Sequence, residues 1–523
     1  MSRAKDTRGI KSWATCSTRS TTESRRGGPS SSDVSRAGAR ELATPIGANQ
    51  ARLDARAAAE VTRGRLLSIA PRARVACGVT TDSRAVVPGG AFVALKGQHH
   101  DGHAFLRAAI DAGAVLVVVE RGRAPEDPRA DAVEVDDTLS AWGALAAAHL
   151  RAWRRERPDA RVVGITGSAG KTTTKELCAA LLRTTGECHA TTGNLNNRVG
   201  LPAVAFQVEA GHRFVVFELG MSLRGEIAAL AAIAQPDVAL VTNVGLAHAE
   251  GLGGTVADVA REKGAIYESL RPGGTAVVNA DDGHALGERR RVPAGVAVTS
   301  FGRSEGAQVR LLERQTDGAT SRVRLERFGV GAASFALSIP GEAAALDFVA
   351  ALAAAEAALG HPLPTAKIAE GLRHLRPIAG RMRLRRLRSG VLVLDDAYNA
   401  NPASVRAAIA TLQEVAEGRR VAVLGEMREL GPAAEREHEA LGEVAADAHV
   451  GLLISCGGLA DVAARAASRR GVPVVFADGA EQAARIAVDR VLPGDCVLVK
   501  ASRSIGAERV VEALALAGGE EPT

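Results

Sequence analysis

Residues 161–175, RVVGITGSAGKTTTK, decide the fold of this chain. The β-branched run from Val162 to Ile165 predicts a strand, the small residues that follow predict a loop, and Leu177 and Leu181 at helical spacing predict a helix. Such a loop lets backbone N–H groups and a helix N-terminus surround a polyphosphate, with Lys171 on the terminal phosphates and the Thr172 hydroxyl on Mg²⁺. A strict phosphate loop would place glycine where Ile165 stands, so the pattern is the shorter T-G-x-x-G-K-T-T.

The alternative is an ordinary glycine-rich turn ahead of a buried helix. Gly-Lys-Thr at a helix start after a strand is the context that favours phosphate binding. The sequence therefore predicts that a nucleoside triphosphate binds Thr166, Gly167, Ser168, Ala169, Gly170, Lys171, Thr172 and Thr173.

Composition limits the class of protein. A chain of 523 residues is too long for one core, so two to four domains are expected. The 46% apolar and 24% charged content is that of a soluble globular protein. A formal charge of +6, with only 3% aromatic residues to stack on bases, favours small anionic ligands over nucleic acid.

Cysteine usage and hydropathy indicate a cytoplasmic protein. The six cysteines are scattered without metal-ligand spacing, which is typical of a reducing compartment rather than of a disulfide framework. No apolar run approaches the roughly 18 residues that span a bilayer, and the N-terminus has no signal-type apolar core. We therefore expect no membrane span and no export.

Strand–helix alternation predicts an α/β protein of three domains. Residues 1–48, rich in Ser, Thr, Arg and Gly without a period, are expected to be a disordered tail. Residues 49–156 are expected to form a smaller N-terminal α/β domain, and residues 157–378 a central domain with a parallel sheet around the phosphate loop. Residues 379–523 repeat the alternation and are expected to form a C-terminal, Rossmann-like α/β domain.

Polar residues stand at the ends of the predicted central strands, where ligands of open α/β sheets collect. One strand ends at Glu218, the next at Asn243 with His248 beyond it, and a third at Asn279. Thr172 and Glu218 together offer the hard oxygen ligands that Mg²⁺ prefers. Taken singly, Glu218 could equally be a solvated strand end and His248 a surface histidine.

Two further features are open to more than one interpretation. Only eight of the 65 basic residues are lysines, which hints that Lys171 and Lys263 supply an amine that arginine cannot, although an exposed lysine on a helix would also explain Lys263. Asp396 follows a C-terminal strand and could hold ribose hydroxyls or simply cap a helix. Ser83, in Thr-Asp-Ser-Arg, taken alone suggests a strand-to-loop turn.

In this order, the residues resemble the Mur ligase family of ATP-dependent amide ligases. The resemblance rests on T-G-x-x-G-K-T-T, the segment 192–197, and then Glu218, His248 and Lys263. It implies ATP and two Mg²⁺ ions, one held by Thr172 and Glu218 and one by His248 and a carbamylated Lys263. It also implies a catalytic set of Lys171, Lys263, His248 and Arg381, and ATP contacts from Asn279 and Asp396.

Residues 395–402, DDAYNANP, resemble the D-alanyl-D-alanine-adding branch of that family. This resemblance implies a monomer that joins UDP-N-acetylmuramoyl-tripeptide, held by the N-terminal domain, to D-alanyl-D-alanine, held by the C-terminal domain. The implied substrate-binding residues are Ser83, Asn196, Asn197, Tyr398, Asn399 and Asn401. A diamino-acid-adding sibling, whose arginine motif is missing here, and a non-catalytic nucleotide-binding scaffold are the alternatives.

The end of the central domain departs from the family pattern G-x-H-N-x-x-N. Here Ala343 stands at the histidine and Asp347 at the last asparagine, which lies near adenine in the family. A carboxylate can accept a hydrogen bond from the adenine amino group but cannot donate one to a ring nitrogen. We therefore expect either altered ATP affinity or an adenine contact from Asn279.

Overall fold

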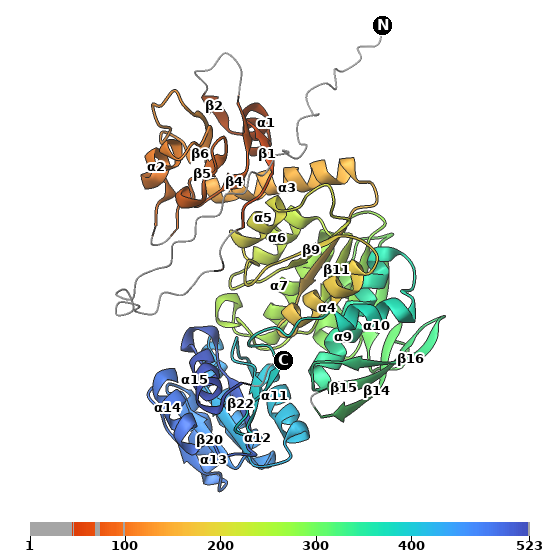
Figure 1. Ribbon diagram of the computed structural model, residues 1–523. Helices are drawn as coiled ribbons and strands as arrows, with labels where there is room; N and C mark the ends of the chain where they lie inside the picture. The colour runs from red at the N-terminus through yellow and green to blue at the C-terminus, as the bar shows by residue number, and fades with distance from the viewer. Residues whose placement is uncertain (1–43, 45–46, 68–73, 98–99, 319, 521–523) are drawn as a thin grey trace. The chain divides into compact units, whose positions relative to one another are not determined.

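The computed structural model describes residues 44, 47–67, 74–97, 100–318 and 320–520 (Figure 1). The tail expected at residues 1–48 lies almost entirely outside the described residues. The chain divides into two compact units, one of residues 1–160 with 191–213 and one of residues 161–190 with 214–523. Within the described ranges, no helix is long and apolar enough to cross a membrane, and no cysteine forms a disulfide.

The first unit contains a five-stranded sheet of order β2-β7-β6-β5-β4, in which only β2 runs antiparallel to its neighbour. A separate antiparallel pair joins β1 to β3. The strands are β1 (Arg52–Asp54), β2 (Arg65–Leu67), β3 (Val75–Cys77), β4 (Val79–Thr80), β5 (Ala91–Val93), β6 (Leu116–Glu120) and β7 (Asp131–Val135). The helices are α1 (Ala55–Thr62), α2 (Leu106–Asp111), α3 (Thr138–Glu156) and α5 (Gly200–Phe206), with 3₁₀ turns η1 (Ser83–Ala85) and η2 (Gly102–Phe105).

Residues 191–213 pack in this first unit, although the sequence placed them in the central domain. The Trp142 and Phe206 rings lie 4.8 Å apart between α3 and α5, and the Trp142 indole N–H donates to the carbonyl oxygen of Val199 at 2.9 Å. Burial of these aromatic rings ties α5 to the long helix α3 rather than to the sheet that precedes and follows it in sequence.

The second unit contains a nine-stranded sheet of order β16-β15-β14-β13-β12-β11-β8-β10-β9, parallel from β9 to β14 and antiparallel beyond. Its strands are β8 (Arg161–Thr166), β9 (Cys188–Ala190), β10 (Phe214–Glu218), β11 (Val238–Val241), β12 (Thr275–Asn279), β13 (Ala297–Gly302), β14 (Val309–Asp317), β15 (Thr320–Arg327) and β16 (Gly331–Leu337). Its helices are α4 (Lys171–Arg183), α6 (Glu226–Ala234), α7 (Val256–Glu268), α8 (Gly283–Gly287), α9 (Glu342–Leu359) and α10 (Thr365–Arg373), with 3₁₀ turns η3 (Glu250–Leu252) and η4 (Glu288–Arg291).

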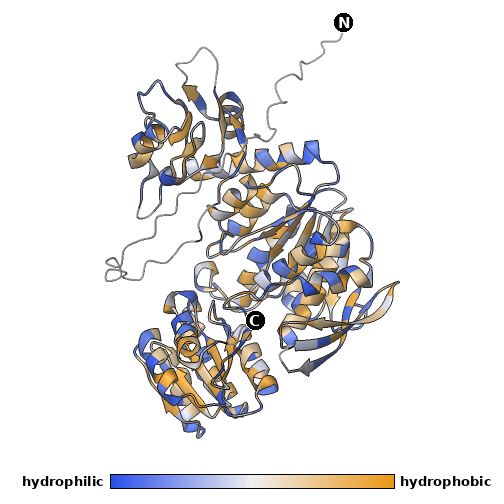
Figure 2. Cartoon of the chain, viewed as in Figure 1, coloured by the Kyte–Doolittle hydropathy of each residue, from blue (hydrophilic) through white to orange (hydrophobic). Residues whose placement is uncertain are grey.

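The position of β8 explains where the site forms. The parallel strands β10 and β11 lie on opposite sides of β8. The order of strands therefore switches direction at β8, and the loops that follow β8 and its neighbours leave a crevice there, where ligands of such sheets bind. The strands here are buried on both faces and therefore almost wholly apolar, as Figure 2 shows. Helices α4 and α9 share one core with these strands.

The same unit also contains a six-stranded, Rossmann-like sheet of order β17-β18-β22-β19-β20-β21, parallel except for β17. Its strands are β17 (Arg383–Arg386), β18 (Leu392–Asp395), β19 (Arg420–Leu424), β20 (Leu452–Ser455), β21 (Val474–Val475) and β22 (Cys496–Lys500). Its helices are α11 (Pro402–Val415), α12 (Ala434–Asp447), α13 (Ala460–Arg469), α14 (Ala480–Arg490) and α15 (Glu508–Gly518), with 3₁₀ turns η5 (Gly431–Ala433) and η6 (Arg503–Ile505). Separate apolar clusters cover its two faces.

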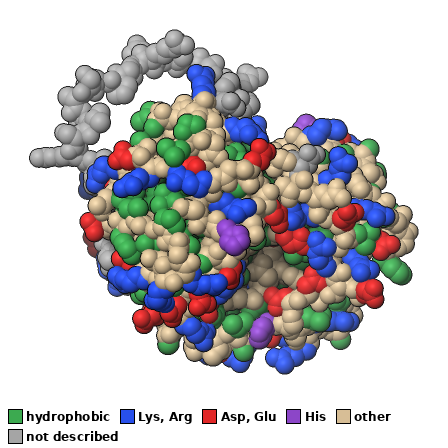
Figure 3. Space-filling model, turned by 90° about the horizontal axis from the view of Figure 1, so that it is seen from below, with side chains coloured by type: hydrophobic (Ala, Val, Ile, Leu, Met, Phe, Trp, Pro, Cys, Tyr) green, Lys and Arg blue, Asp and Glu red, His purple; other side chains and the backbone are tan. Residues whose placement is uncertain are grey.

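Three α/β sheets are thus present, as the sequence predicted. On the face of the molecule drawn in Figure 3, basic and acidic side chains are interspersed rather than gathered by sign.

Candidate active site

The predicted phosphate loop connects β8 to α4, and two of its glycines are required by geometry. Gly167 has φ 153° and Gly170 has φ 79°. A Cβ on Gly167 would lie 1.8 Å from the Thr242 hydroxyl oxygen, and one on Gly170 would lie 2.1 Å from Asp347 Oδ1. Both neighbours approach the loop more closely than any side chain would allow.

The end of β11 holds the loop in place. Asn243 accepts from the Ser168 N–H through its carbonyl oxygen and from the Ala169 N–H through Oδ1, both at 2.9 Å. The Thr242 hydroxyl donates to the Ala169 carbonyl oxygen at 2.6 Å. The amides in the first turn of α4, which have no acceptor within the helix, face the loop as a ready anion site.

Two lysines, the half-buried Lys171 and the buried Lys263, converge on one carbonyl oxygen of the loop. Lys171 Nζ donates to the Gly167 carbonyl at 2.7 Å, and Lys263 Nζ, from α7, donates to the same oxygen at 3.0 Å. Burial lowers the pKa of Lys171, with Glu218 opposing and Arg381 adding to the shift. Burial also lowers the pKa of Lys263, well below its ordinary value, and the charge of Lys171 lowers it further.

Arg381 reaches the loop from just before β17. Its Nη2 donates to the Thr172 hydroxyl oxygen at 3.2 Å, and its guanidinium lies 4.2 Å from the centre of the Tyr398 ring. Arg503 lies 5.2 Å from the same ring centre. Lys171, Lys263 and Arg381, three of the four predicted catalytic residues, therefore surround one loop.

Two of the predicted metal ligands, Thr172 and Glu218, lie near the phosphate loop, whereas His248 contacts another loop. Thr172 opens α4 beside the loop, and Glu218 ends β10 as a buried carboxylate close enough to oppose the pKa shift of Lys171. Their hydroxyl and carboxylate oxygens suit Mg²⁺ chemically. His248 instead contacts the carboxylate of Glu429 through Nδ1, and no pattern in the sequence points to that glutamate. Among the described residues there is no group of three or more His, Cys, Asp or Glu side chains that could hold a metal.

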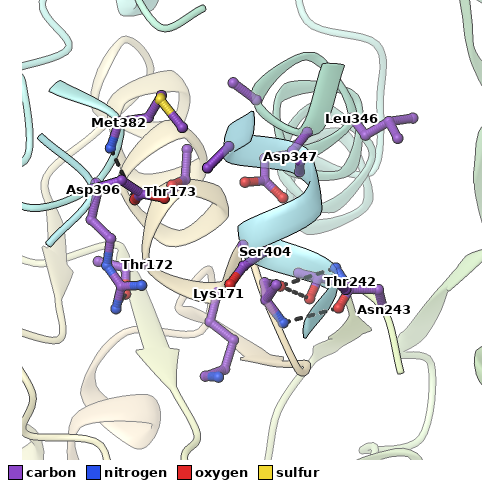
Figure 4. A pocket seen from close by; sticks show the side chains of 18 of the residues that line it. Lys171, Thr172, Thr173, Thr242, Asn243, Leu346, Asp347, Met382, Asp396 and Ser404 are labelled. Carbon is purple, nitrogen blue, oxygen red and sulfur yellow. Dashed lines mark hydrogen bonds between the residues drawn. The ribbon is translucent and has the colours of Figure 1, made fainter. Parts of the chain in front are cut away.

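Asp396 lines the site but its oxygens are already engaged. Oδ2 accepts from the buried Lys500 Nζ at 2.5 Å, and Oδ1 accepts from the Met382 N–H at 3.1 Å (Figure 4). Lys500 Nζ also donates to the Asn399 carbonyl oxygen at 3.0 Å. The carboxylate thus fixes the turn after Arg381, and a ribose would have to share it.

Asn401 has a clear local role. Its side chain caps α11 through a reciprocal capping box with Ser404, ahead of Pro402 at the first helical position. Its Nδ2 donates to the Ser168 carbonyl oxygen at 3.1 Å, so the start of α11 is tied to the phosphate loop. Asn399 accepts from the Ala400 N–H through Oδ1.

These elements enclose a pocket of about 350 Å³ (Figure 4). Polar groups of the loop line it together with small or apolar residues. The apolar lining residues include Phe301, Ile339, Pro340, Ala343, Ala344, Leu346, Ala403, Ala407 and Ala408. Lys500, Met382 and Ser404 also line the pocket and were not predicted. The Lys-Ala-Ser sequence that begins at the last residue of β22 was the available signal for Lys500.

Asp347 stands where the sequence departs from the family pattern near adenine. In Figure 4 its carboxyl points from α9 into the pocket. Burial raises its pKa well above the ordinary value, opposed by the nearby Thr174 hydroxyl and by the charge of Arg381. Burial therefore favours the neutral carboxylic acid, which unlike a carboxylate has a donor as well as an acceptor.

The other predicted residues act within their own elements. The Thr166 hydroxyl donates to the Leu219 carbonyl oxygen at 2.9 Å, and Asn279 Nδ2 donates to the Thr242 carbonyl oxygen at 2.7 Å while its side chain lines the pocket. In the first unit, Ser83 opens η1.

Asn196 and Asn197 precede α5 in the same unit. Asn197 Oδ1 accepts from the N–H groups of Val199 and Gly200 at 3.1 and 2.8 Å, which fixes the start of that helix. The Asn196 N–H donates to the Asn194 carbonyl oxygen at 2.8 Å.

Comparison with known families gives three successive matches. Residues 76–150 match the catalytic domain of the Mur ligase family, residues 165–355 the Mur ligase middle domain, and residues 380–503 the glutamate ligase domain of Mur ligases.

Individual relatives cover nearly the same length. A UDP-N-acetylmuramoyl-tripeptide--D-alanyl-D-alanine ligase of Escherichia coli is 36% identical, over 83% of this chain and 93% of its own. The ligase of that name from Bacillus subtilis is 31% identical over 87% and 97%. The crystal structure of MurF from Acinetobacter baumannii has a TM-score of 0.79 at 30% identity, covering 88% of this chain and 98% of its own. A MurF ligase of Thermotoga maritima in complex with ADP has a TM-score of 0.72 at 30% identity, covering 84% and 97%.

Proposed function

The chain belongs to the Mur ligase family, and we propose that it joins D-alanyl-D-alanine to UDP-N-acetylmuramoyl-tripeptide at the cost of ATP. The relatives that cover most of its length carry that name. The product is the UDP-linked pentapeptide used in peptidoglycan synthesis. ATP, the UDP precursor and the dipeptide are cytoplasmic metabolites, so we place the protein, as a monomer, in the cytoplasm.

The observation that carries the proposal is the convergence of cationic groups on one anion site. Lys171 and Arg381 come from segments 210 residues apart and flank the start of α4. Positive groups aimed at transferring phosphoryl oxygens stabilise the charge that develops there. A scaffold that only bound a nucleotide would have no use for Arg381 at the Thr172 hydroxyl.

In the first step, the terminal carboxylate of the tripeptide attacks the γ-phosphorus of ATP, and ADP leaves, which gives an acyl phosphate. The ammonium group of Lys171 binds the terminal phosphates from the loop side, and Arg381 binds the transferring group from the C-terminal side. The loop amides hold the remaining phosphate oxygens, and Asn279 and Asp347 lie toward the base. In this arrangement Asp396 shares its carboxylate between Lys500 and the ribose.

In the second step, the amine of D-alanyl-D-alanine attacks the acyl carbon, and phosphate leaves from the tetrahedral adduct. We propose that Tyr398, Asn399 and Asn401 line the dipeptide side. Enclosure of the pocket excludes water, which would otherwise hydrolyse the acyl phosphate. Ser83, Asn196 and Asn197 are proposed to bind the UDP precursor from the first unit.

We propose two Mg²⁺ sites. Thr172 and Glu218 would hold one ion, and His248 with Lys263 as its carbamate would hold the other. When bound, the ions supply positive charge that neutralises the phosphate and carboxylate oxygens. Burial lowers the pKa of Lys263 and so favours its neutral amine. Only the neutral amine can add carbon dioxide, because a protonated amine has no lone pair to attack with.

The test is phosphate release from Mg-ATP with UDP-N-acetylmuramoyl-tripeptide, with and without D-alanyl-D-alanine. Release that requires both, with an equal amount of UDP-pentapeptide formed, is the expected result. Release only with meso-diaminopimelate or lysine, on the shorter UDP-dipeptide, would make the chain the diamino-acid-adding sibling instead. Lys171→Met should abolish release, while Lys367→Met, an exposed lysine paired with Glu370, should leave it unchanged.

A further inference from the structure

The loop after β11 and the loop after β19 meet at one pair of side chains, His248 and Glu429. The His248 ring pairs through Nδ1 with the Glu429 carboxylate. The Glu250 N–H donates to the Glu429 carbonyl oxygen at 3.2 Å. The His248 side chain is 24% exposed and that of Glu429 is 48% exposed, so water reaches the pair only in part. The two loops are therefore joined through both side chain and main chain.

Both members of the pair have an unusual backbone. His248 has φ 58° and Glu429 has φ 63°, in the left-handed region that residues with a Cβ adopt only at a cost. Such conformations persist where surrounding contacts specify them, and they concentrate at functional sites. The side chains are thus directed toward each other by a backbone that neither residue would adopt by itself.

The loop that carries Glu429 is fixed by its neighbours. The Arg428 N–H donates to the Ser502 hydroxyl oxygen at 2.9 Å. The Met427 N–H donates to Nε2 of the buried His438 at 2.9 Å. Glu429 therefore follows a segment whose backbone is fixed by hydrogen bonds to neighbouring elements.

The pairing decides which ring nitrogen of His248 is available. The ring nitrogen that faces the Glu429 carboxylate is Nδ1, in contact with Oε2. In a neutral ring the N–H on Nδ1 donates to that oxygen, and Nε2 keeps its lone pair. A carboxylate on one nitrogen of an imidazole fixes the tautomer and the ring orientation and makes the other nitrogen a better metal ligand.

We propose that Glu429 is a positioning residue for His248, whose carboxylate holds the imidazole so that Nε2 is presented to a divalent cation. The inference rests on the proposed function in one respect, the role of His248 as a metal ligand. If the contact between His248 and Glu429 only joined the two loops, it would contribute to stability, and its loss would leave cation affinity unchanged.

The test uses Mn²⁺ as the probe, with the full chain and ADP, and measures free Mn²⁺ by electron paramagnetic resonance. Glu429→Ala should weaken one Mn²⁺ site by about 10- to 100-fold, the usual effect of losing such a partner. Glu429→Gln keeps an acceptor oxygen without the charge and should give a smaller loss. Glu426→Ala, in the same loop but paired with Arg428, should bind Mn²⁺ like the unaltered chain.

The variant His248→Ala separates the positioning role of Glu429 from the metal-binding role of His248. If His248→Ala loses an ion and Glu429→Ala binds both ions normally, the positioning role is wrong and the proposed function stands. If His248→Ala binds both ions at full affinity, the metal role of His248 fails first. If thermal denaturation shows that Glu429→Ala does not fold, Glu429→Gln decides, and unchanged affinity in that variant overturns the inference.

Discussion

Lys263→Ala tests the site most directly, because two lysine amines share one acceptor. Lys171 Nζ and Lys263 Nζ lie 2.7 and 3.0 Å from the Gly167 carbonyl oxygen. The triangle with that oxygen keeps the nitrogens within about 5.7 Å of each other. Two positive charges at that separation repel by about 3 kcal/mol at an effective dielectric constant of roughly 20. This repulsion opposes protonation of both amines at once.

The proposed conversion of Lys263 to a carbamate would reverse the sign of this interaction. The neutral amine would add carbon dioxide and release a proton, and the resulting anion would attract Lys171 where the ammonium group repelled it. Removal of that anion by Lys263→Ala should lower kcat by about 10²-fold or more and leave the chain folded. Lys263→Arg should be equally inactive because a guanidinium group stays charged and cannot form the carbamate.

The assay couples phosphate release to UDP-pentapeptide formation in buffers with and without bicarbonate. Carbon-13 NMR in labelled bicarbonate should show a carbamate carbon in the unaltered chain and none in Lys263→Ala. Lys367→Ala, an exposed lysine paired with Glu370, serves as the matched control. Normal turnover in Lys263→Ala or Lys263→Arg, or full activity without a carbamate signal, would refute the reasoning.

Three further substitutions address the loop and its supports. Gly170→Ala would place a Cβ 2.1 Å from Asp347 Oδ1 at φ 79° and should weaken ATP binding, measured by calorimetry, by about tenfold or more. Burial raises the pKa of Asp347 well above the 3.8 that it has in the unfolded chain, so the folded chain holds the extra proton and loses stability as pH rises above about 4. Asp347→Asn should therefore raise the unfolding free energy by roughly 1–3 kcal/mol near pH 8 and leave it unchanged near pH 3, as thermal denaturation would show. Asn401→Ala loses the cap of α11 and the bond to the Ser168 carbonyl oxygen, which should cost about 1 kcal/mol of stability in denaturant titrations.

The phosphate loop was predictable because its determinants are local. The strand over residues 161–166, the two glycines and Gly-Lys-Thr at the helix start lie within 15 residues, and the structure has β8 end at Thr166 and α4 begin at Lys171. The prediction of a D-alanyl-D-alanine-adding ligase, based on residues 395–402, agrees with the names of the relatives. In both cases a short run of residues carries the information.

The contacts that position the site were not predictable because they join distant segments. Lys500 meets Asp396 across 104 residues and Glu429 meets His248 across 181. Each side chain seen alone is an ordinary charged residue. The raised pKa of Asp347 depends on burial within the fold, which sequence spacing does not reveal. Residues 191–213 were likewise assigned by their position in the chain, whereas aromatic packing on α3 places them in the first unit.

Two bonds to the phosphate loop explain how the Rossmann-like sheet can take part in chemistry on the central sheet. Arg381 donates to the Thr172 hydroxyl, and Asn401 donates to the Ser168 carbonyl oxygen. Arg381 stands beside a turn held by Asp396, and Asn401 is fixed as a helix cap, so neither donor can reach the loop unless its own element is correctly folded and placed. The guanidinium group that we propose for phosphoryl transfer then reaches the loop only when both sheets are in contact with it. This requirement would restrict ATP cleavage to the enclosed pocket, where water is excluded and the acyl phosphate survives until the amine arrives.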